Sequence, residues 1–347
     1  MATTGHGNGQ VDPAGTVKVG IVGCGIMGKK HAESCLQLPG VSVASVADPQ
    51  VERARTLAAD TGAKAFGGTA EMLAAGPLDA VVVATPPGYR REAVELAASA
   101  GAAVFGEKPI ALDMASVQAM CRAIDGASAV NSVGFQLRYS PLAHRAQELI
   151  AGRTVTHLRS LTTTSYYLER DMPLWYLQRQ HSGGPLLEQS IHMIDMARRL
   201  VGEITQVSAV GYREEKPDLP AADSEDAMVL SLRFDGGALG SHVDSCGMDQ
   251  FNWEVELFGE DWRLQVDFAR NRLRGRFNGD PLEEDPPKGD YHLKEMEAFI
   301  TAARRRKQEG IMSSFADAGV TLATVLAARE SLDAGGEWRR VGALGAE

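Results

Sequence analysis

The stretch VKVGIVGCGIMG at residues 17–28 runs from an apolar segment directly into three closely spaced glycines. The pattern predicts a strand, a tight turn and then a helix. Gly25 lets the backbone approach a pyrophosphate, and Gly28 lets the helix pack on the strand. The free amides and the dipole at the helix N-terminus favour a diphosphate. The residues predicted to surround the phosphates are Gly23, Gly25, Ile26, Met27 and Gly28.

An acid closes the next apolar run. Asp48 follows Val41–Val46 and stands about 20 residues after Gly28, the spacing typical of an acid that binds a ribose diol. A carboxylate there repels a 2′-phosphate, so the sequence predicts NAD, and nearby Arg53 leaves NADP open. The alternative is a glycine-rich turn in an α/β protein that binds no nucleotide.

Length, charge and cysteine content narrow the class of protein. A chain of 347 residues predicts two domains or one large domain. The formal net charge of −10 argues against nucleic acid and anionic membranes as partners, and no apolar run is long enough to span a bilayer. The four cysteines show no paired spacing, which indicates thiols in a reducing cytoplasm. Residues 1–15 lack the basic and apolar parts of a signal peptide and are expected to form a flexible tail.

Residues 16–135 alternate strand and helix patterns. Their apolar strands imply burial on both faces, as in a doubly wound parallel sheet covered by helices. The expected strands are Val17–Val22, Val41–Ala47, Ala63–Phe66, Asp79–Ala84, Ala103–Phe105 and Ala129–Phe135. The expected helices are Met27–Leu38, Val51–Thr61, Thr69–Ala75, Tyr89–Ala100 and Met114–Ile124.

Residues 136–347 are expected to form a second domain, which binds substrate and forms an oligomer. Its strands alternate apolar and polar residues, so we expect a large, mostly antiparallel sheet with one open face. The expected strands are Thr154–Tyr167, Ile204–Tyr212, Ala227–Phe234, Ala238–Val243, Asn252–Phe258 and Trp262–Phe268. A dimer or tetramer would bury the apolar face of this sheet; alternatively, the late helices cover it.

Helices and one loop complete the second domain. A helix is expected at Pro185–Val201, with proline at its start and Gly202 just past its end. The acidic, proline-containing segment Asn278–Asp290 is expected to be a surface loop. Helices are expected at Tyr291–Lys307 and Ser313–Leu332, and at least one of them should pack back on the first domain.

Two short motifs follow the fourth and fifth strands of the first domain, at the edge where such sheets bind ligands. Thr85-Pro86-Pro87 forms a rigid turn there, and Glu107-Lys108-Pro109 brings Lys108 to the same edge. A partly desolvated lysine beside a nicotinamide could donate or accept a proton near neutral pH. The alternative is a solvated loop lysine.

The helix at Pro185–Val201 carries four polar residues at spacings of four, three and four, which place them on one face. They are Glu188, His192, Asp195 and Arg199. A histidine with a carboxylate one turn away can be a tuned general base. The alternative is a solvated face with paired charges, and spacing alone favours it. The other histidines show no metal-ligand pattern, so no metal is predicted, and no serine lies in a nucleophile elbow.

Taken together, these motifs resemble the family of glucose–fructose oxidoreductase and inositol 2-dehydrogenase (Gfo/Idh/MocA). The resemblance spans roughly residues 17–202, and the motifs stand in the family's order. They are Gly23-x-Gly25-x-x-Gly28, Asp48, Thr85-Pro86-Pro87, Glu107-Lys108-Pro109, Gly134-Phe135-Gln136-Leu137-Arg138-Tyr139 and Gly183-Gly184-Pro185-Leu186-Leu187-Glu188-x-x-x-His192-x-x-Asp195. The resemblance implies a Rossmann domain, an open-sheet domain that forms the oligomer, a nicotinamide cofactor and a sugar or cyclitol substrate.

The resemblance also implies that Lys108 and His192 carry catalysis. This chain departs from the family pattern near the substrate. Glu188 stands where the family usually has aspartate, and Arg90 stands where many members have histidine. Gln136 and Leu137 replace the usual residues before an arginine. These changes concern which substrate binds.

The leading hypothesis is a reversible alcohol–ketone oxidoreductase. His192 would accept the proton, Lys108 would stabilise the reacting oxygen, and Glu188 would orient His192. The predicted nicotinamide-side contacts are Thr85, Pro86, Glu107 and Lys108. The predicted substrate contacts are Gln136, Arg138, Tyr166, Trp175 and His192. Two alternatives stay open: a glycosidase or lyase that oxidises a sugar transiently with a retained NAD, and a non-catalytic nucleotide sensor.

Overall fold

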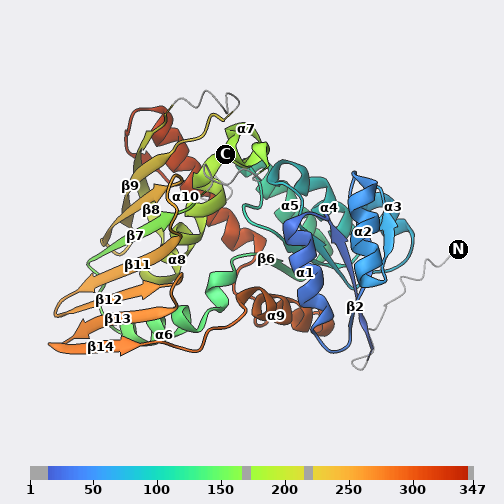
Figure 1. Ribbon diagram of the computed structural model, residues 1–347, viewed down its shortest axis with the longest axis horizontal. Helices are drawn as coiled ribbons and strands as arrows, with labels where there is room; N and C mark the ends of the chain where they lie inside the picture. The colour runs from blue at the N-terminus through green and yellow to red at the C-terminus, as the bar shows by residue number, and fades with distance from the viewer. Residues whose placement is uncertain (1–14, 166–172, 215–221, 343–347) are drawn as a thin grey trace, which may run out of the picture.

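A computed structural model describes residues 15–165, 173–214 and 222–342. The chain forms two sheets side by side, each covered by helices, with the large sheet at one end of the molecule (Figure 1). Among the described residues, no helix is both long enough and apolar enough to cross a bilayer. The predicted α/β architecture with two unlike sheets is confirmed.

The first sheet has six parallel strands in the order β3-β2-β1-β4-β5-β6. Its strands are β1 (Val17–Val22), β2 (Val41–Ala47), β3 (Lys64–Phe66), β4 (Ala80–Val83), β5 (Ala103–Gly106) and β6 (Asn131–Val133). Its helices are α1 (Ile26–Leu36), α2 (Val51–Thr61), α3 (Thr69–Ala74), α4 (Arg90–Ser99) and α5 (Met114–Ala127), with a 3-10 turn η1 (Pro87–Tyr89). The strand order reverses between β1 and β4, and ligands bind at such a switch point.

The second sheet has nine strands in the order β14-β13-β12-β11-β7-β10-β9-β8-β15. Its neighbours are antiparallel except β7 and β10, which are parallel. The strands are β7 (His157–Thr163), β8 (Ile204–Tyr212), β9 (Ala227–Phe234), β10 (Leu239–Ser245), β11 (Asn252–Gly259), β12 (Trp262–Asp267), β13 (Arg272–Phe277), β14 (Asp280–Glu284) and β15 (Arg339–Arg340). Helices cover only one face, which leaves the other open, as Figure 1 shows.

The helices of the second half connect the two sheets. They are η2 (Gln136–Tyr139), α6 (Pro141–Ile150), η3 (Leu174–Leu177), α7 (Arg179–Ser182), the π-helical turn η4 (Leu186–Ser190), α8 (Ile191–Val201), α9 (Tyr291–Arg305) and α10 (Phe315–Asp333). Helix α9 packs against α1 of the first half, and its Phe299 also meets Phe105 of β5 edge to face, at 5.5 Å between ring centroids. Helix α10 lies against α5, α8 and β8. The last two helices therefore hold the halves together.

Two sequence-based expectations were wrong in detail. The expected surface loop Asn278–Asp290 contains β14, whose Pro281 pairs with Arg276 of β13. A proline is tolerated because β14 lies at the sheet edge and needs ladder bonds on one side only. The expected continuous helix Pro185–Val201 instead begins with the π-helical turn before α8. The sequence also gave no prediction of helix α6 or strand β13.

Candidate active site

The glycine turn after β1 lets other groups approach its backbone closely. Gly23 has φ +93°, a conformation that favours glycine. A Cβ on Gly28 would lie 1.9 Å from the Gly23 carbonyl oxygen, so α1 can pack on this turn only with glycine there. A Cβ on Gly25 would meet nothing within 4 Å, and no side chain caps α1. The turn therefore offers open space in front of free helix amides, which suits a pyrophosphate.

Asp48 closes β2 beside this turn. Its Oδ2 accepts the Cys24 amide at 2.9 Å and its Oδ1 accepts the Gln50 amide at 2.8 Å. The carboxylate is buried and fixed next to the phosphate turn, where the ribose of a dinucleotide would follow. The glycine turn, the uncapped helix start and this acid together fit a bound NAD.

Glu107 holds the turn after β5 from inside the protein. Its Oε1 lies 2.6 Å from Nε2 of His31 on α1, and its Oε2 accepts the Lys108 amide at 3.0 Å. Burial opposes ionisation of Glu107, but its hydrogen bond to His31 and the charges of His31, Lys108 and Arg90 lower its pKa to about 2. The predicted cofactor contact Glu107 is therefore an ionised anchor for the backbone of Lys108. Nearby, the hydroxyl of Thr85 is buried with no partner among the described residues.

Lys108 reaches across to the second half of the chain. Its Nζ donates to the Glu188 carbonyl oxygen at 2.7 Å and lies 3.4 Å from Glu188 Oε2. Burial raises the pKa of Glu188, although the positive charges of Lys108 and Arg90 oppose that rise. The solvated-lysine alternative is wrong, because the Lys108 side chain is only 14% exposed.

His192 lies one helical turn beyond Glu188, at the start of α8. Its ring is buried between Trp253, at 4.8 Å between ring centroids, and Phe135, at 6.1 Å. Burial, and then the positive charge of Lys108, hold the pKa of His192 well below 6.5. The imidazole is therefore neutral near pH 7 and able to accept a proton.

The expected contact between Glu188 and His192 is absent from the described hydrogen bonds. Glu188 contacts Lys108, and Nδ1 of His192 has no partner among the described residues. The solvated-face alternative is wrong for Glu188, His192 and Asp195, which are buried, while Arg199 is exposed. The helix face is polar because it meets other chain segments, not water.

A bond from the large sheet secures the π-helical turn that carries Glu188. The Ser190 hydroxyl donates to Asp244 of β10, whose other oxygen receives the Cys246 thiol at 3.4 Å. All three side chains are buried. Sequence analysis missed Ser190, Asp244 and Trp253, because their relation to the site depends on strands that are distant in the chain.

Arg138 lies in a different environment from the one expected. Its guanidinium makes two bonds to Asp195, at 2.8 and 2.6 Å, donates to the Met312 carbonyl oxygen and pairs with Asp317 at 2.6 Å. The Arg138 side chain is only 5% exposed, so its donors serve these partners and not solvent. This geometry gives Arg138 a structural role that joins η2, α8 and α10, in place of the substrate contact that the sequence predicts.

Two of the other predicted substrate contacts, Gln136 and Trp175, lie within the described residues. Gln136 is buried at the start of η2, directly after Phe135, which contacts His192. Trp175 of η3 is partly buried and stacks on Tyr176 at 4.1 Å. Tyr166 lies outside the described residues. Pro86 precedes η1 in the turn after β4.

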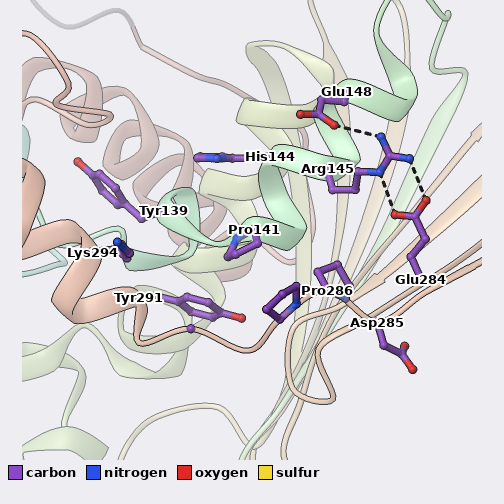
Figure 2. A pocket seen from close by; sticks show the side chains of 12 residues that line it. Tyr139, Pro141, His144, Arg145, Glu148, Glu284, Asp285, Pro286, Tyr291 and Lys294 are labelled. Carbon is purple, nitrogen blue, oxygen red and sulfur yellow. Dashed lines mark hydrogen bonds and ion pairs between the residues drawn. The ribbon is translucent and has the colours of Figure 1, made fainter.

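A cavity of about 830 Å³ lies elsewhere, between α6, the segment after β14 and the start of α9 (Figure 2). Its walls include Tyr139 and Tyr291 but none of the predicted catalytic residues. Arg145 forms two bonds of 2.8 Å to Glu284 and one to Glu148, as Figure 2 shows. Arg145, Glu148 and Glu284 thus pair with one another at its rim. Within the described ranges, no group of three or more His, Cys, Asp or Glu side chains is arranged to hold a metal ion.

Comparison with known proteins decides the family. Residues 17–135 match a profile described as an oxidoreductase family with an NAD-binding Rossmann fold, and residues 143–265 match the GFO/IDH/MocA C-terminal domain. The chain belongs to the GFO/IDH/MocA oxidoreductase family. The resemblance inferred from the motifs is confirmed, and the protein is an NAD-binding oxidoreductase.

Similar proteins support this assignment. The inositol 2-dehydrogenase of Rhizobium meliloti (strain 1021) is 34% identical over 84% of this chain and 89% of that protein. The scyllo-inositol 2-dehydrogenase (NAD(+)) of Bacillus subtilis (strain 168) is 30% identical over 74% of this chain and 75% of that protein. A solved structure of levoglucosan dehydrogenase in complex with NADH has a TM-score of 0.86 at 24% identity and covers 94% of this chain and 100% of that one. At that identity the structural likeness concerns the fold.

Proposed function

We propose that this enzyme interconverts a secondary alcohol and a ketone on a sugar, cyclitol or glycoside. The observation that carries the proposal is the meeting of Lys108 with Glu188, one turn before a neutral, buried His192. The Lys108 amine comes from the NAD-binding half and the His192 imidazole from the other half, and in this proposal both act on one substrate. The bound NAD supplies the hydride acceptor or donor, and the protein supplies the proton transfer and the orientation.

Each side chain has a distinct role in this proposal. His192 accepts the hydroxyl proton in the oxidation direction, because its imidazole is neutral. Lys108 donates a hydrogen bond to the reacting oxygen and stabilises its developing charge. Glu188 holds the Lys108 ammonium through both its backbone carbonyl and its carboxylate. This differs from the sequence-based role, in which Glu188 orients His192.

The substrate class rests on the relatives. Their names include inositol 2-dehydrogenase and scyllo-inositol 2-dehydrogenase, so a neutral polyhydroxy compound is the first candidate. The partly buried ring of Trp253, beside His192, offers apolar surface against the carbon skeleton of such a compound.

The test is a panel of cyclitols, sugars and glycosides incubated with NAD+, with NADH followed by absorbance. Stoichiometric NADH is expected with at least one compound. Product without net NADH would replace the proposal with a glycosidase or lyase, and no turnover across the panel would favour a nucleotide sensor. His192→Ala should lower turnover by about 10²–10⁴-fold while NADH affinity stays near that of the wild type. His181→Ala, at an exposed histidine, is the matched control.

We further propose that the open face of the large sheet forms a homodimer or homotetramer. Val210, Val229 and Val243 are exposed and lie side by side across β8, β9 and β10. An apolar row of this kind on a sheet face is a typical interaction surface. Val229→Lys should lower the mass measured by light scattering, and an unchanged mass would contradict this surface.

The four cysteines are free, which supports the predicted cytoplasmic location.

A further inference from the structure

Arg90, the first residue of α4, has a buried side chain that makes no ion pair within salt-bridge distance among the described residues. It donates from Nε to the Thr85 carbonyl oxygen at 2.8 Å. Its Nη1 donates to the carbonyl oxygens of Glu107 and Pro109. The three acceptors belong to two turns, one after β4 and one after β5. Two of them are the carbonyls on either side of Lys108.

The remaining contacts of Lys108 are fixed from other directions. Its amide donates to Glu107, which His31 holds from α1. Its ammonium donates to Glu188 in the second half. Without the guanidinium, the carbonyls of residues 107 and 109 would lose a buried donor. The turns after β4 and β5 would then be joined only by the Glu107 amide, which donates to the Val83 carbonyl oxygen at 3.0 Å, among the described hydrogen bonds.

We propose that Arg90 is a positioning residue that clamps the backbone on both sides of Lys108 and couples it to the Thr85 turn. This inference rests on the proposed function, in which Lys108 contacts the reacting oxygen. The clamp would fix the distance between the Lys108 ammonium and the turn at Thr85, on the predicted nicotinamide side. A displacement of about 1 Å at such a group can lower the rate of turnover by 10²-fold.

The chemistry of the side chain suits this task. A guanidinium presents five donors in one rigid plane, so it can serve carbonyls on two turns at once. A lysine would place one flexible point charge there, with fewer donors aligned. Burial lowers the pKa of Arg90, and the nearby carboxylates of Glu107 and Glu188 oppose that fall.

The experiment compares Arg90→Lys and Arg90→Met with Arg91→Lys and Arg91→Met. Arg91 is the neighbouring residue on α4, is exposed and pairs with Glu95, so it is a matched control. Using the compound that the wild type oxidises, we expect Arg90→Met to lower kcat by about 10–100-fold. KM and the NADH dissociation constant should stay within about three-fold, and Arg90→Lys should recover part of kcat.

A second readout needs no substrate. Competitive labelling of the full-length protein with acetic anhydride, read by mass spectrometry, measures the reactivity of Lys108 against that of exposed Lys307. Lys108 is held in hydrogen bonds in the wild type, so labelling should be slow and should rise at least about three-fold in both Arg90 variants. The Arg91 variants should label like the wild type.

The outcomes separate this inference from the proposed function. If the wild type turns over nothing in the panel, the proposed function fails, and labelling of Lys108 still decides whether Arg90 acts as a clamp. Folded Arg90→Met with wild-type kcat and wild-type labelling overturns the inference. Equal falls in kcat and in NADH affinity also overturn it, because they indicate general damage. If Arg90→Met does not fold, the same criteria apply to Arg90→Lys.

Discussion

Replacing Arg138 with methionine tests whether this residue serves structure or substrate. The side chain is 5% exposed and donates twice to Asp195, which is itself 1% exposed. In Arg138→Met the Asp195 carboxylate keeps only the Thr321 hydroxyl, at 3.0 Å, among its described side-chain partners. We therefore expect a buried, uncompensated charge beside α8.

The size of the effect follows from burial. Removing one partner of a buried ion pair destabilises a protein by about 3–5 kcal/mol. At about 2 °C per kcal/mol for a chain of this size, Tm should fall by about 6–10 °C. Arg138 also pairs with Asp317, whose side chain is 34% exposed, and such a half-exposed pair adds little.

The assay is thermal unfolding followed by circular dichroism, with KM measured well below Tm. The double variant Arg138→Met with Asp195→Leu should regain most of the lost Tm, because no buried charge then lacks a partner. A Tm within about 2 °C of the wild type, or a large rise in KM at unchanged Tm, would refute the structural role and restore a substrate contact.

Three further predictions concern other buried carboxylates. Asp48→Ser should weaken NADH binding by about 10–100-fold, because the ribose loses its acceptor. The preference for NADH over NADPH should also become smaller, because the negative charge that repels a 2′-phosphate is lost. Fluorescence titration of both nucleotides checks this, and an unchanged preference would count against it. Glu295 is fully buried, both of its oxygens lack partners among the described residues, and burial, then the charge of Glu107, raises its pKa well above 4.5. As the pH rises, the unfolded chain therefore loses this proton before the folded chain does. The free energy of unfolding of the wild type then falls above about pH 4.3, by about 1.4 kcal/mol per pH unit, until the folded-state pKa is reached. Glu295→Gln removes that fall, so its Tm advantage should grow with pH, whereas parallel curves of Tm against pH would contradict a neutral Glu295. Ser190→Ala removes a donor from buried Asp244 and should lower stability by about 1–3 kcal/mol, visible as a lower Tm; equal Tm values would show that the bond contributes nothing.

The first sheet was predictable because its signals are local. Strands β1, β2, β4 and β5 are mostly apolar in sequence, and β1, β2 and α2 begin and end as expected. Strand β14 was missed because prolines predict loops, and only its place at the sheet edge makes Pro281 acceptable. The edge position of β14 depends on its pairing with β13, and no local pattern in the segment predicts that pairing.

The residues of the proposed site follow from the sequence motifs, but their contacts do not. The motifs identified Lys108, His192 and Glu188, but helical spacing could not show that Glu188 faces a lysine 80 residues earlier in the chain. Spacing also could not separate a solvated helix face from a buried polar one. Arg138 and Asp195 stand 57 residues apart, and their pairing is visible only once η2 and α8 are packed together.

The division of the site between the two sheets has an evolutionary consequence. In the proposed site, the predicted NAD contacts and Lys108 come from the first half, whereas His192 of α8 and the neighbouring Trp253 of β11 come from the second. Over evolution, substitutions in the second half could therefore change which compound the proposed site accepts and leave the predicted NAD-binding residues unchanged.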